Sequence, residues 1–405
     1  MHAATFPESL DRTLADGLNA PRCAVCRAQD FEILQTQSLE LVGLGRCEIT
    51  FGTCRQCGHV QQAPAVPQAL MHRHYQFFSH YTLQDDIERI RSAPPGPQTN
   101  RLLSITRDVG VTAGRAYEIG CATGLHLDHF RRAGWMVGGC DPSSKAVAQA
   151  KEVYEIDLDV GGEETCLPRQ SNLDLVLMSH VLEHLYDPAA TLGRTHAVLR
   201  EGGTLVLEVP CAVAPELLPP GWFAFEHLHY FSPDTVEALL RSAGFEMLEI
   251  RIAMKAFIYP VMAVAARKIC SPSSRSFLPS TDKAGRVARE FVIRDMARWA
   301  KVRDRLSQQR GEAFIWGAGV HTALLLFHTG LMQHLTVAAI IDRDSQKWGH
   351  TQAGIPVVSP EDLMDRVSEA PIIVSSYYAE REIVTTLRES GVDPKRIIAL
   401  YHEDT

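Results

Sequence analysis

The chain has 405 residues, with 40 Lys and Arg against 48 Asp and Glu, which gives a formal net charge of −8. This length predicts two or three domains, because domains hold about 150 residues on average. A hydrophobic content of 45% with 22% charged residues is typical of globular protein and excludes a fibrous or disordered chain. The acidic balance argues against a nucleic-acid partner, which requires a concentrated basic surface.

The chain's N-terminal stretch has neither the basic nor the apolar region of a signal peptide, and 10 cysteines are few for a disulfide scaffold of this length. We therefore expect a cytoplasmic protein with reduced thiols. The longest apolar stretch, residues 256–266, is shorter than the roughly 20 residues that cross a bilayer. We expect a buried or interface helix there and no membrane partner.

Two Cys-x-x-Cys pairs lie near the N-terminus, separated by 27 residues. Such pairs place four thiolates where a tetrahedral Zn²⁺ can bind, and a set of four thiolates leaves no position open for catalysis. The sequence therefore predicts a structural zinc site, and the alternative is four unrelated buried thiols. The candidate ligands are Cys23, Cys26, Cys54 and Cys57.

A hairpin over residues 32–44 is expected between the two pairs. Cys47 is a weaker candidate ligand, because it lacks a Cys-x-x-Cys partner. Residues 71–86 follow and are rich in aromatic residues and histidine, and a Pro-rich break at residues 93–97 marks a domain boundary. The aromatic stretch either packs between domains or forms a lid over a small-molecule pocket.

The next segment predicts a nucleotide-binding turn. Residues 115–119 read as a buried strand, Gly120 to Gly124 as the turn, and residues 125–133 as a helix. Small residues in such a turn let the backbone approach a ligand closely. A second strand over residues 135–140 ends at Asp141, an acid placed to accept the hydroxyls of a ribose.

The acid at the end of the first strand favours one cofactor over another. An NAD site would prefer a Gly-x-Gly-x-x-Gly turn, whereas here Glu118 precedes the turn and Ala122 stands in its middle. Glu118 would repel a pyrophosphate but suits a cationic amino-acid ligand such as S-adenosylmethionine (SAM). Further strands are expected at residues 173–178 and 204–209. The fold class is therefore α/β, with a Rossmann-like sheet.

A cluster of Glu, His and Tyr lies at residues 223–232. In an extended conformation, His227 and His229 would point the same way and Glu226 the opposite way. The functional hypothesis is proton abstraction from a methyl acceptor, for which a neutral imidazole near its ordinary pKa is suited. The alternative is ordinary packing at the sheet edge.

Taken together, these motifs resemble class I SAM-dependent methyltransferases over about residues 100–250. The residues that carry the resemblance are Glu118-Ile-Gly-Cys-Ala-Thr-Gly124, Asp141, Asp174 to His184, and Leu199 to Gly203. The whole layout is similar to the deoxysugar C-methyltransferases, which have an N-terminal zinc ribbon, a SAM domain with a Glu-His pair, and a C-terminal Rossmann-like domain. Two departures stand out: Ala224-Phe225 replaces the family's Tyr-His, and the turn at Gly317 lacks the family's lysine.

The resemblance implies roles for particular residues. The acid-base residues would be His227, Glu226, His184 or His180, and Tyr75 or Tyr81, with His229 as a further candidate. The cofactor would be held by Glu118, Gly120, Cys121, Ala122, Thr123, Gly124, Asp141, Pro142, Ser179 and His180. The methyl acceptor would be a small molecule such as a nucleotide-linked sugar, and the chain a monomer or homodimer.

The C-terminal third predicts a second α/β unit. Residues 313–316 read as a strand, Gly317 to Gly319 as a turn, residues 321–329 as a helix, and residues 337–341 as a strand that ends at Asp342. Strands are also expected at residues 371–375 and 396–400, and an amphipathic helix at residues 286–310. The third glycine of a dinucleotide turn is missing, so this unit either faces a nucleotide-linked substrate or is purely structural.

The expected domains are a ribbon and lid at residues 1–92, a SAM domain at 98–270, a linker and helix at 271–310, and a Rossmann-like domain at 311–405. The leading hypothesis is a SAM-dependent methyltransferase that acts on a C or O atom of a small molecule. The alternatives are a non-catalytic scaffold that binds a partner, an O- or N-methyltransferase of a non-sugar metabolite, and an NAD-dependent enzyme that uses the C-terminal turn.

Overall fold

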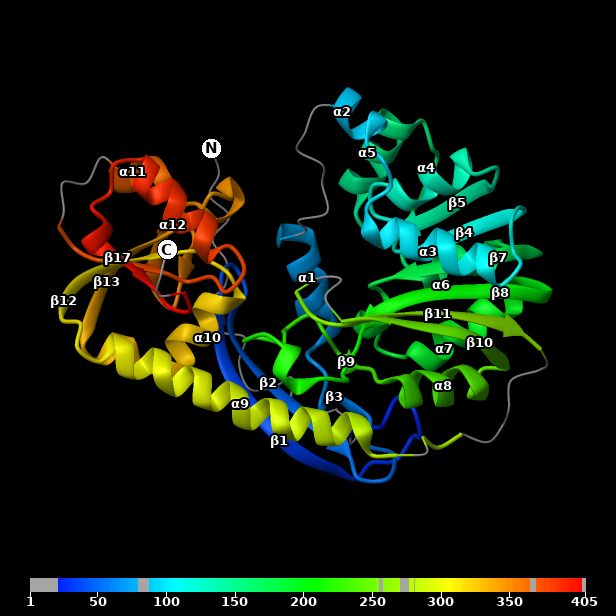
Figure 1. Ribbon diagram of the computed structural model, residues 1–405, viewed down its shortest axis with the longest axis horizontal. Coiled ribbons are helices and arrows are strands. Elements are labelled where there is room, and N and C mark those ends of the chain that lie inside the picture. Colours follow the sequence, from blue (N-terminus) through cyan, green and yellow to red (C-terminus); the bar gives the residue numbers. More distant parts are fainter. Residues whose placement is uncertain are drawn as a thin grey trace.

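The computed structural model describes residues 21–78, 87–254, 258–269, 277–279, 281–364 and 369–402. Three sheets organise these residues, and the four-stranded sheet comes first along the chain, followed by a seven-stranded and a six-stranded sheet (Figure 1). The seven-stranded sheet and its helices form one lobe, and the six-stranded sheet belongs to the other (Figure 1).

The first sheet is antiparallel and has the order β1-β2-β3-β9. Its strands are β1 (Phe31–Leu41), β2 (Gly45–Cys54), β3 (Val60–Gln62) and β9 (His229–Tyr230). The hairpin between the cysteine pairs is therefore longer than expected, because its return strand runs into Cys54 itself. β9 pairs with β3, with His229 opposite Gln61, although more than 160 residues separate the two strands in the sequence. The segment that carries Glu226 and His227 is thereby anchored to the first sheet.

The central sheet has the order β10-β11-β8-β7-β4-β5-β6. Its strands are β4 (Arg115–Ile119), β5 (Met136–Asp141), β6 (Asp159–Val160), β7 (Leu173–Ser179), β8 (Leu199–Pro210), β10 (Phe245–Ala253) and β11 (Val261–Lys268). β4 to β8 are parallel, and β11 pairs antiparallel with both of its neighbours. This arrangement confirms the expected Rossmann-like sheet, and the carboxyl ends of its parallel strands form one ligand-binding edge.

The expected helix over residues 256–266 is wrong where the structure describes this stretch. Val261 to Ala266 are buried and form most of strand β11. β11 lies between β8 and β10 and is covered on both faces, so its sequence is a continuous apolar run without the alternation of a half-exposed strand. An apolar run of this length does not distinguish a buried strand from a buried helix.

The third sheet has the order β14-β15-β13-β12-β16-β17. Its strands are β12 (Gly311–Trp316), β13 (Leu335–Ile341), β14 (Thr351–Gln352), β15 (Ile355–Val358), β16 (Ile372–Val374) and β17 (Ile397–Ala399). All pairs are parallel except β14 with β15. The expected second α/β unit is therefore present.

Local sequence signals start several helices. Ser143 accepts a hydrogen bond from the Ala146 N–H at the start of α5, and Ser232 forms a capping box with Thr235 at the start of α8. Asp187 caps α7 and is followed by Pro188 at the first helical position. The helices are α1 (Gln68–Phe78), α2 (Ile87–Ser92), α3 (Pro97–Asp108), α4 (Leu125–Arg132), α5 (Ser144–Tyr154), α6 (Glu163–Cys166), α7 (Pro188–Val198), α8 (Pro233–Ser242), α9 (Lys283–Leu306), α10 (Val320–Thr329), α11 (Pro360–Met364) and α12 (Glu380–Glu389).

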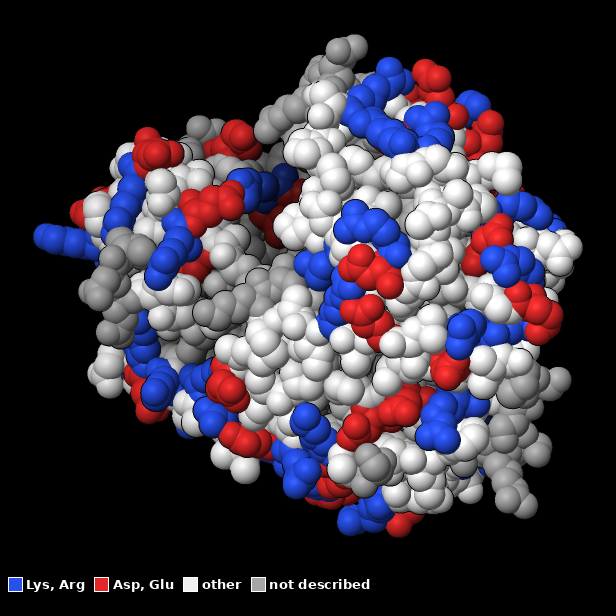
Figure 2. All heavy atoms as spheres, turned by 45° about the vertical axis from the view of Figure 1, so that its right-hand side comes forward, with Lys and Arg blue, Asp and Glu red and all other residues white. Residues whose placement is uncertain are grey.

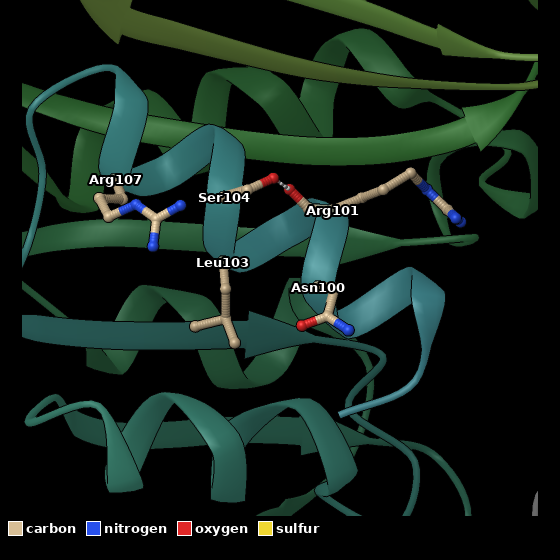
Figure 3. Close-up of a pocket in the computed structure, with 5 residues that line it drawn as sticks. All are labelled: Asn100, Arg101, Leu103, Ser104 and Arg107. Atoms are coloured by element: carbon tan, nitrogen blue, oxygen red, sulfur yellow. Dashed lines mark hydrogen bonds between the residues drawn. The ribbon is translucent and has the colours of Figure 1, made fainter. Parts of the chain in front are cut away.

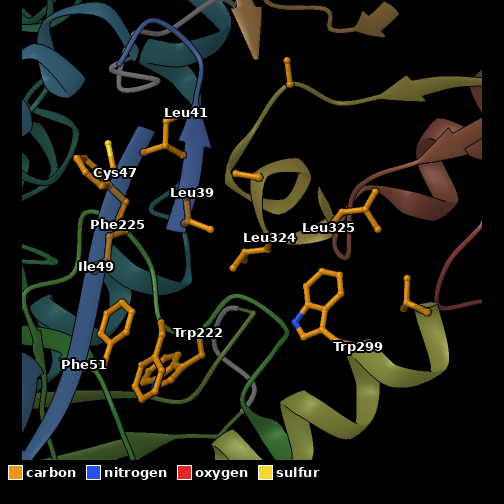
Figure 4. Packing of buried hydrophobic residues seen from close by; sticks show 14 of the residues in the cluster. Leu39, Leu41, Cys47, Ile49, Phe51, Trp222, Phe225, Trp299, Leu324 and Leu325 are labelled. Carbon is orange, nitrogen blue, oxygen red and sulfur yellow. The ribbon is translucent and has the colours of Figure 1, made fainter. Parts of the chain in front are cut away.

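One hydrophobic core joins the first and third sheets. It contains Leu39 and Ile49 from the hairpin, Trp299 from the long helix α9, and Leu324 from α10 (Figure 4). The Arg289 side chain on α9 also donates hydrogen bonds to the Glu32 carboxylate on β1. The first sheet and the C-terminal unit therefore pack against each other, and the central sheet has cores of its own.

Charged residues of both signs are interspersed over the face shown in Figure 2. No helix in the described part of the chain is long and apolar enough to cross a membrane.

Candidate active site

The turn after β4 has the backbone geometry of a nucleotide-binding turn. Gly120 has a φ of +67°, and a Cβ at this position would lie 2.5 Å from the Cγ2 atom of Val181. Gly124 also has a positive φ, at +77°, and stands at the N-terminus of α4. Glycine is required at both positions because other residues are strained there, and the turn lies at the carboxyl edge of the sheet.

Two acids face this turn. Asp141 accepts hydrogen bonds from the Ala122 N–H at 2.9 Å and the Ser143 N–H at 2.8 Å, one on each carboxylate oxygen. Each oxygen keeps a second lone pair for a ligand hydroxyl. Burial raises the pKa of Asp141. Glu118 is 1% exposed, and burial together with the Asp141 charge raises its pKa to about 8.

The residues of this turn fit SAM. Glu118 Oε2 is buried and has no hydrogen-bond partner among the described residues. An unpartnered buried carboxylate oxygen is costly unless a donor or cation reaches it, and the ammonium group of SAM is such a group. The other predicted cofactor residues follow three neighbouring strands, so the fold brings all of them to one edge: Cys121 and Thr123 after β4, Pro142 after β5, and Ser179 and His180 at the end of β7.

A buried network of charges supports the end of β7, and the sequence analysis missed most of it. The His180 ring lies 3.4 Å from a carboxylate oxygen of Glu183 and 3.4 Å from one of Glu208. Arg101 on α3 donates two hydrogen bonds to Glu208, at 2.7 and 2.8 Å. Burial alone would lower the pKa of His180, but the two carboxylates raise it to about 9. His180 is therefore charged at neutral pH.

The predicted acid-base residues form a second cluster next to this network. The Tyr75 hydroxyl lies 2.9 Å from His184 Nδ1, which also lies 2.9 Å from the backbone oxygen of Glu226. The rings of His184 and His227 are 4.9 Å apart between centroids. Four of the predicted residues, contributed by α1, the segment after β7 and the segment before β9, therefore lie side by side.

His227 is 8% exposed, and its Nδ1 has no hydrogen-bond partner among the described residues. Burial and the neighbouring His184 lower its pKa to about 4, so the ring is neutral at pH 7. Burial would raise the pKa of Glu226, but its electrostatic interactions with the surrounding histidines hold it below the usual value. The pair thus offers a neutral imidazole beside a carboxylate.

His229 does not join this cluster. Its Nε2 lies 2.9 Å from the Leu185 backbone oxygen, and its Nδ1 lies 3.2 Å from His59 Nε2. The expected alternation fails because only His229 and Tyr230 are extended, and the chain bends at residues 225 and 226. Both ring nitrogens of His229 therefore have structural partners. Tyr81, the alternative to Tyr75, lies outside the described residues.

The four predicted zinc ligands converge. Cys23 Sγ lies 3.5 Å from Cys57 Sγ, and Cys26 Sγ lies 3.5 Å from Cys54 Sγ. All four sulfur atoms lie within 4.8 Å of one another. This donor set fits Zn²⁺, which binds four thiolates tetrahedrally. Cys47 is buried in the hairpin core instead, so it is not part of the cluster.

One cavity among the described residues lies elsewhere, along α3. It has a volume of about 380 Å³ and is lined by one exposed side of α3 (Figure 3). Arg101 extends away from the other lining residues in this view and reaches Glu208 at the edge of the sheet. None of the predicted site residues lines this cavity.

The C-terminal turn repeats the backbone design of the first one. Asp342 accepts hydrogen bonds from the Ala318 N–H at 2.7 Å and the Asp344 N–H at 2.9 Å. Here, however, Lys347 Nζ also donates to Asp342, at 3.0 Å. The His321 ring fills the space beside the turn and lies 2.9 Å from the Ser375 hydroxyl and 2.7 Å from the Tyr401 hydroxyl.

Comparison with known proteins agrees with the central sheet. Residues 72–250 match a methyltransferase domain family, and residues 310–398 match a family described as C2185-like, N-terminal. The chain is 41% identical over 98 residues to the ubiquinone biosynthesis O-methyltransferase of Bradyrhizobium sp. (strain ORS 278), a match that covers 23% of this chain and only 38% of that relative.

A longer match is to the C-methyltransferase NovU of Streptomyces niveus, which is 28% identical over 302 residues and covers 69% of this chain and 71% of the relative. Among solved structures, the Burkholderia thailandensis 1,6-didemethyltoxoflavin-N1-methyltransferase aligns with a TM-score of 0.39 and 15% identity, over 52% of this chain and 96% of that chain. The family match and the order of the seven strands agree, and residues 72–250 of this chain are a class I SAM-dependent methyltransferase domain.

Proposed function

We propose that this protein transfers the methyl group of SAM to a carbon or oxygen atom of a small molecule, with the Glu226–His227 pair taking the acceptor's proton. The observation that carries the proposal is the segment of residues 179–184. Val181 packs against Gly120 of the cofactor turn, and His184 belongs to the cluster of Tyr75, Glu226 and His227. This contact of one short segment with both groups supports a proton acceptor beside the methyl donor's site.

Methyl transfer from SAM requires few catalytic groups from the protein. When bound, SAM supplies an activated methyl group on a sulfonium, so the chain has to orient the acceptor and remove its proton. Neutral His227 has an available lone pair at Nδ1, and Glu226 beside it stabilises the imidazolium that forms. Tyr75 and the Glu226 backbone oxygen fix the orientation of the His184 ring, and hence that wall of the acceptor site.

For the acceptor, we propose a nucleotide-linked sugar or a related secondary metabolite. The support is the long match to a relative named as a C-methyltransferase and the three-part layout shared with the deoxysugar enzymes. The shorter match to O-methyltransferases favours an oxygen acceptor as the second candidate. Incubation of the protein with labelled SAM and a panel of nucleotide sugars distinguishes the two, because the product's methyl group is on carbon in one case and on oxygen in the other.

Calorimetry with SAM tests the proposal as a whole, since a non-catalytic scaffold with a decayed site would not bind it. We expect His227→Ala to lower turnover about 10³-fold, within the usual range for a lost acid-base group, while SAM affinity stays unchanged. His350→Ala, a change at an exposed histidine in the C-terminal unit, is the matched control and should leave both unchanged. Equal losses of turnover and SAM affinity in His227→Ala would indicate a structural histidine instead.

We also propose that the four-cysteine cluster binds one structural Zn²⁺. Metal analysis of the purified protein should give one zinc per chain, and Cys23→Ser should lose the metal and unfold the first sheet at a lower temperature. Cys47→Ser is the matched control, because Cys47 is a buried thiol of the same sheet that does not face the cluster. A Cys23→Ser protein that keeps the wild-type melting temperature would contradict a structural role.

A further inference from the structure

Glu183 is the most unusual buried acid in the described part of the chain. It is 0% exposed, and neither of its carboxylate oxygens has a hydrogen-bond partner among the described residues. Two histidine rings lie beside it, with His180 Nδ1 at 3.4 Å and His184 Nε2 at 3.7 Å. A fully buried carboxylate without hydrogen bonds is costly. The His180 ring compensates its charge only in part, because Glu208 shares that ring.

The ring of His184 presents a lone pair to this carboxylate. Its Nδ1 lies 2.9 Å from the Glu226 backbone oxygen, which can only accept a hydrogen bond. Nδ1 of the neutral ring therefore carries the proton and shares it with the Tyr75 hydroxyl at 2.9 Å. Nε2 is then the unprotonated nitrogen, and it faces Glu183.

His227 completes a set of three donors. Its Nδ1 is buried and has no hydrogen-bond partner among the described residues. One ligand atom from each of Glu183, His184 and His227 can be chosen so that all three lie within 4.8 Å of one another. We propose that these three residues bind a divalent metal ion, in a site separate from the four-cysteine cluster.

The chemistry of the donors narrows the choice of metal. Two imidazoles and one carboxylate, without thiolates, suit divalent manganese, iron or zinc, and this combination leaves coordination positions open. The hydrogen bond from His184 Nδ1 to a backbone oxygen is the usual outer contact that orients a metal-binding histidine. The three proposed ligands are therefore already close together, and one of them, His184, already has the hydrogen bond that orients it.

This inference rests on the proposed function and changes one role in it, because His227 becomes a metal ligand and Glu226 alone takes the proton. The open positions would take two adjacent oxygens of the acceptor, which favours an acceptor with neighbouring hydroxyl or keto groups. With His227 held by the metal, the proton from the acceptor goes to Glu226, whose Oε2 has no hydrogen-bond partner among the described residues. The electron pair released on the acceptor forms the new bond to the methyl carbon, and the pair of the broken S–CH₃ bond stays on sulfur.

Binding of Mn²⁺, followed by electron paramagnetic resonance on the full-length protein with its zinc retained, tests the site. Mn²⁺ prefers oxygen and imidazole ligands and competes poorly for thiolates, so it reports on this site alone. We expect one Mn²⁺ per chain. Glu183→Gln and His227→Ala should each weaken binding at least about tenfold. Should Glu183→Gln fail to fold, His227→Ala carries the test.

Two further variants separate a ligand from its neighbour. Glu226→Gln should keep the Mn²⁺ affinity within about threefold while losing methyl transfer, because Glu226 is assigned the proton and not the metal. His350→Ala should keep both. Absence of Mn²⁺ binding to the wild-type protein, or binding that neither His227→Ala nor Glu183→Gln weakens, would overturn the metal site.

Calorimetry with SAM on the same samples distinguishes this failure from failure of the proposed function. SAM binding without Mn²⁺ binding would leave the methyltransferase proposal standing and remove the metal site. Absence of SAM binding would remove the proposed function itself.

Discussion

The turn after β4 and the turn after β12 share one backbone design and differ in what surrounds it. In both, an acid at the tip of the next strand accepts the N–H of an alanine in the turn, Ala122 for Asp141 and Ala318 for Asp342. Asp342 is neutralised by Lys347, whereas no lysine or arginine among the described residues pairs with Asp141. In the C-terminal unit a lysine of the protein therefore neutralises the acid of the turn, whereas in the central unit the acid is left for a ligand.

The residue before each turn shows the same contrast. Glu118 precedes the first turn with an unpartnered carboxylate oxygen, and apolar Ile315 occupies the corresponding position before the second. His321 then fills the space beside the second turn and contacts Ser375 and Tyr401. A glycine turn with a distal acid therefore predicts the fold, and only the charges around it indicate whether a ligand binds.

Asp342→Ala should have the largest effect on stability. It leaves Lys347, which is 8% exposed, as a buried charge without its main partner, and breaking such a pair costs about 3 kcal/mol. We expect the free energy of unfolding to fall by that amount in denaturant titrations, with SAM affinity within about twofold of wild type. Adding Lys347→Met should restore most of the stability. A large loss of SAM affinity would instead connect the second turn with the cofactor site.

Asp141→Ala should have the opposite pattern. Removing an acceptor of two ribose hydroxyls is expected to cost about 2 kcal/mol, or roughly 30-fold in SAM affinity measured by calorimetry. The loss of two backbone hydrogen bonds should lower stability less than Asp342→Ala does, because no buried cation is left without a partner. Unchanged SAM affinity would contradict the assignment of Asp141 to the ribose.

The smallest expected effect is a pH dependence of SAM binding that comes from Glu118, for which the second turn has no titratable counterpart. The pKa of Glu118 is about 8 in the folded protein and about 4.5 in an unfolded chain, so folding takes up a proton between these pH values and stability falls as pH rises through them. A cationic ligand favours the carboxylate, so SAM binding should release a proton and tighten from about pH 6 to pH 8.

Calorimetry in buffers with different ionisation enthalpies measures that proton release. Glu118→Gln should abolish it, while Asp342→Asn should leave it unchanged. Proton release that persists in Glu118→Gln would assign the titration to another group.

The sequence was sufficient for those parts of the fold that depend on local patterns. The strand, turn, helix and acid from residue 115 to Asp141 follow from apolar runs and glycines, and the structure confirms them. β11 was mistaken for a helix because an apolar run covered on both sides has no periodicity to read. The pairing of β9 with β3 was not foreseen, because residues more than 160 positions apart share no local signal.

The candidate site was predicted less completely. The cluster of His184, Glu226 and His227 came from motif resemblance. Its catalytic roles and the bounds of the four expected segments stay predictions. Glu183 and Glu208 were missed, although a signal existed for Glu208, which is the one charged residue in the buried stretch from Thr204 to Pro210. A lone acid in an apolar strand implies a buried partner, and here Arg101 is that partner.

The core shared by the first and third sheets has a consequence for synthesis of the chain. Leu39 and Ile49 leave the ribosome early, but Trp299 and Leu324, which cover them, follow more than 200 residues later. Chain synthesis adds about 5–20 residues per second, so the apolar side of the hairpin stays exposed for at least about 10 seconds before these residues are made. All strands of the central sheet have been synthesised by then. The methyltransferase domain can therefore fold before the ribbon that precedes it, and early termination would leave an aggregation-prone hairpin.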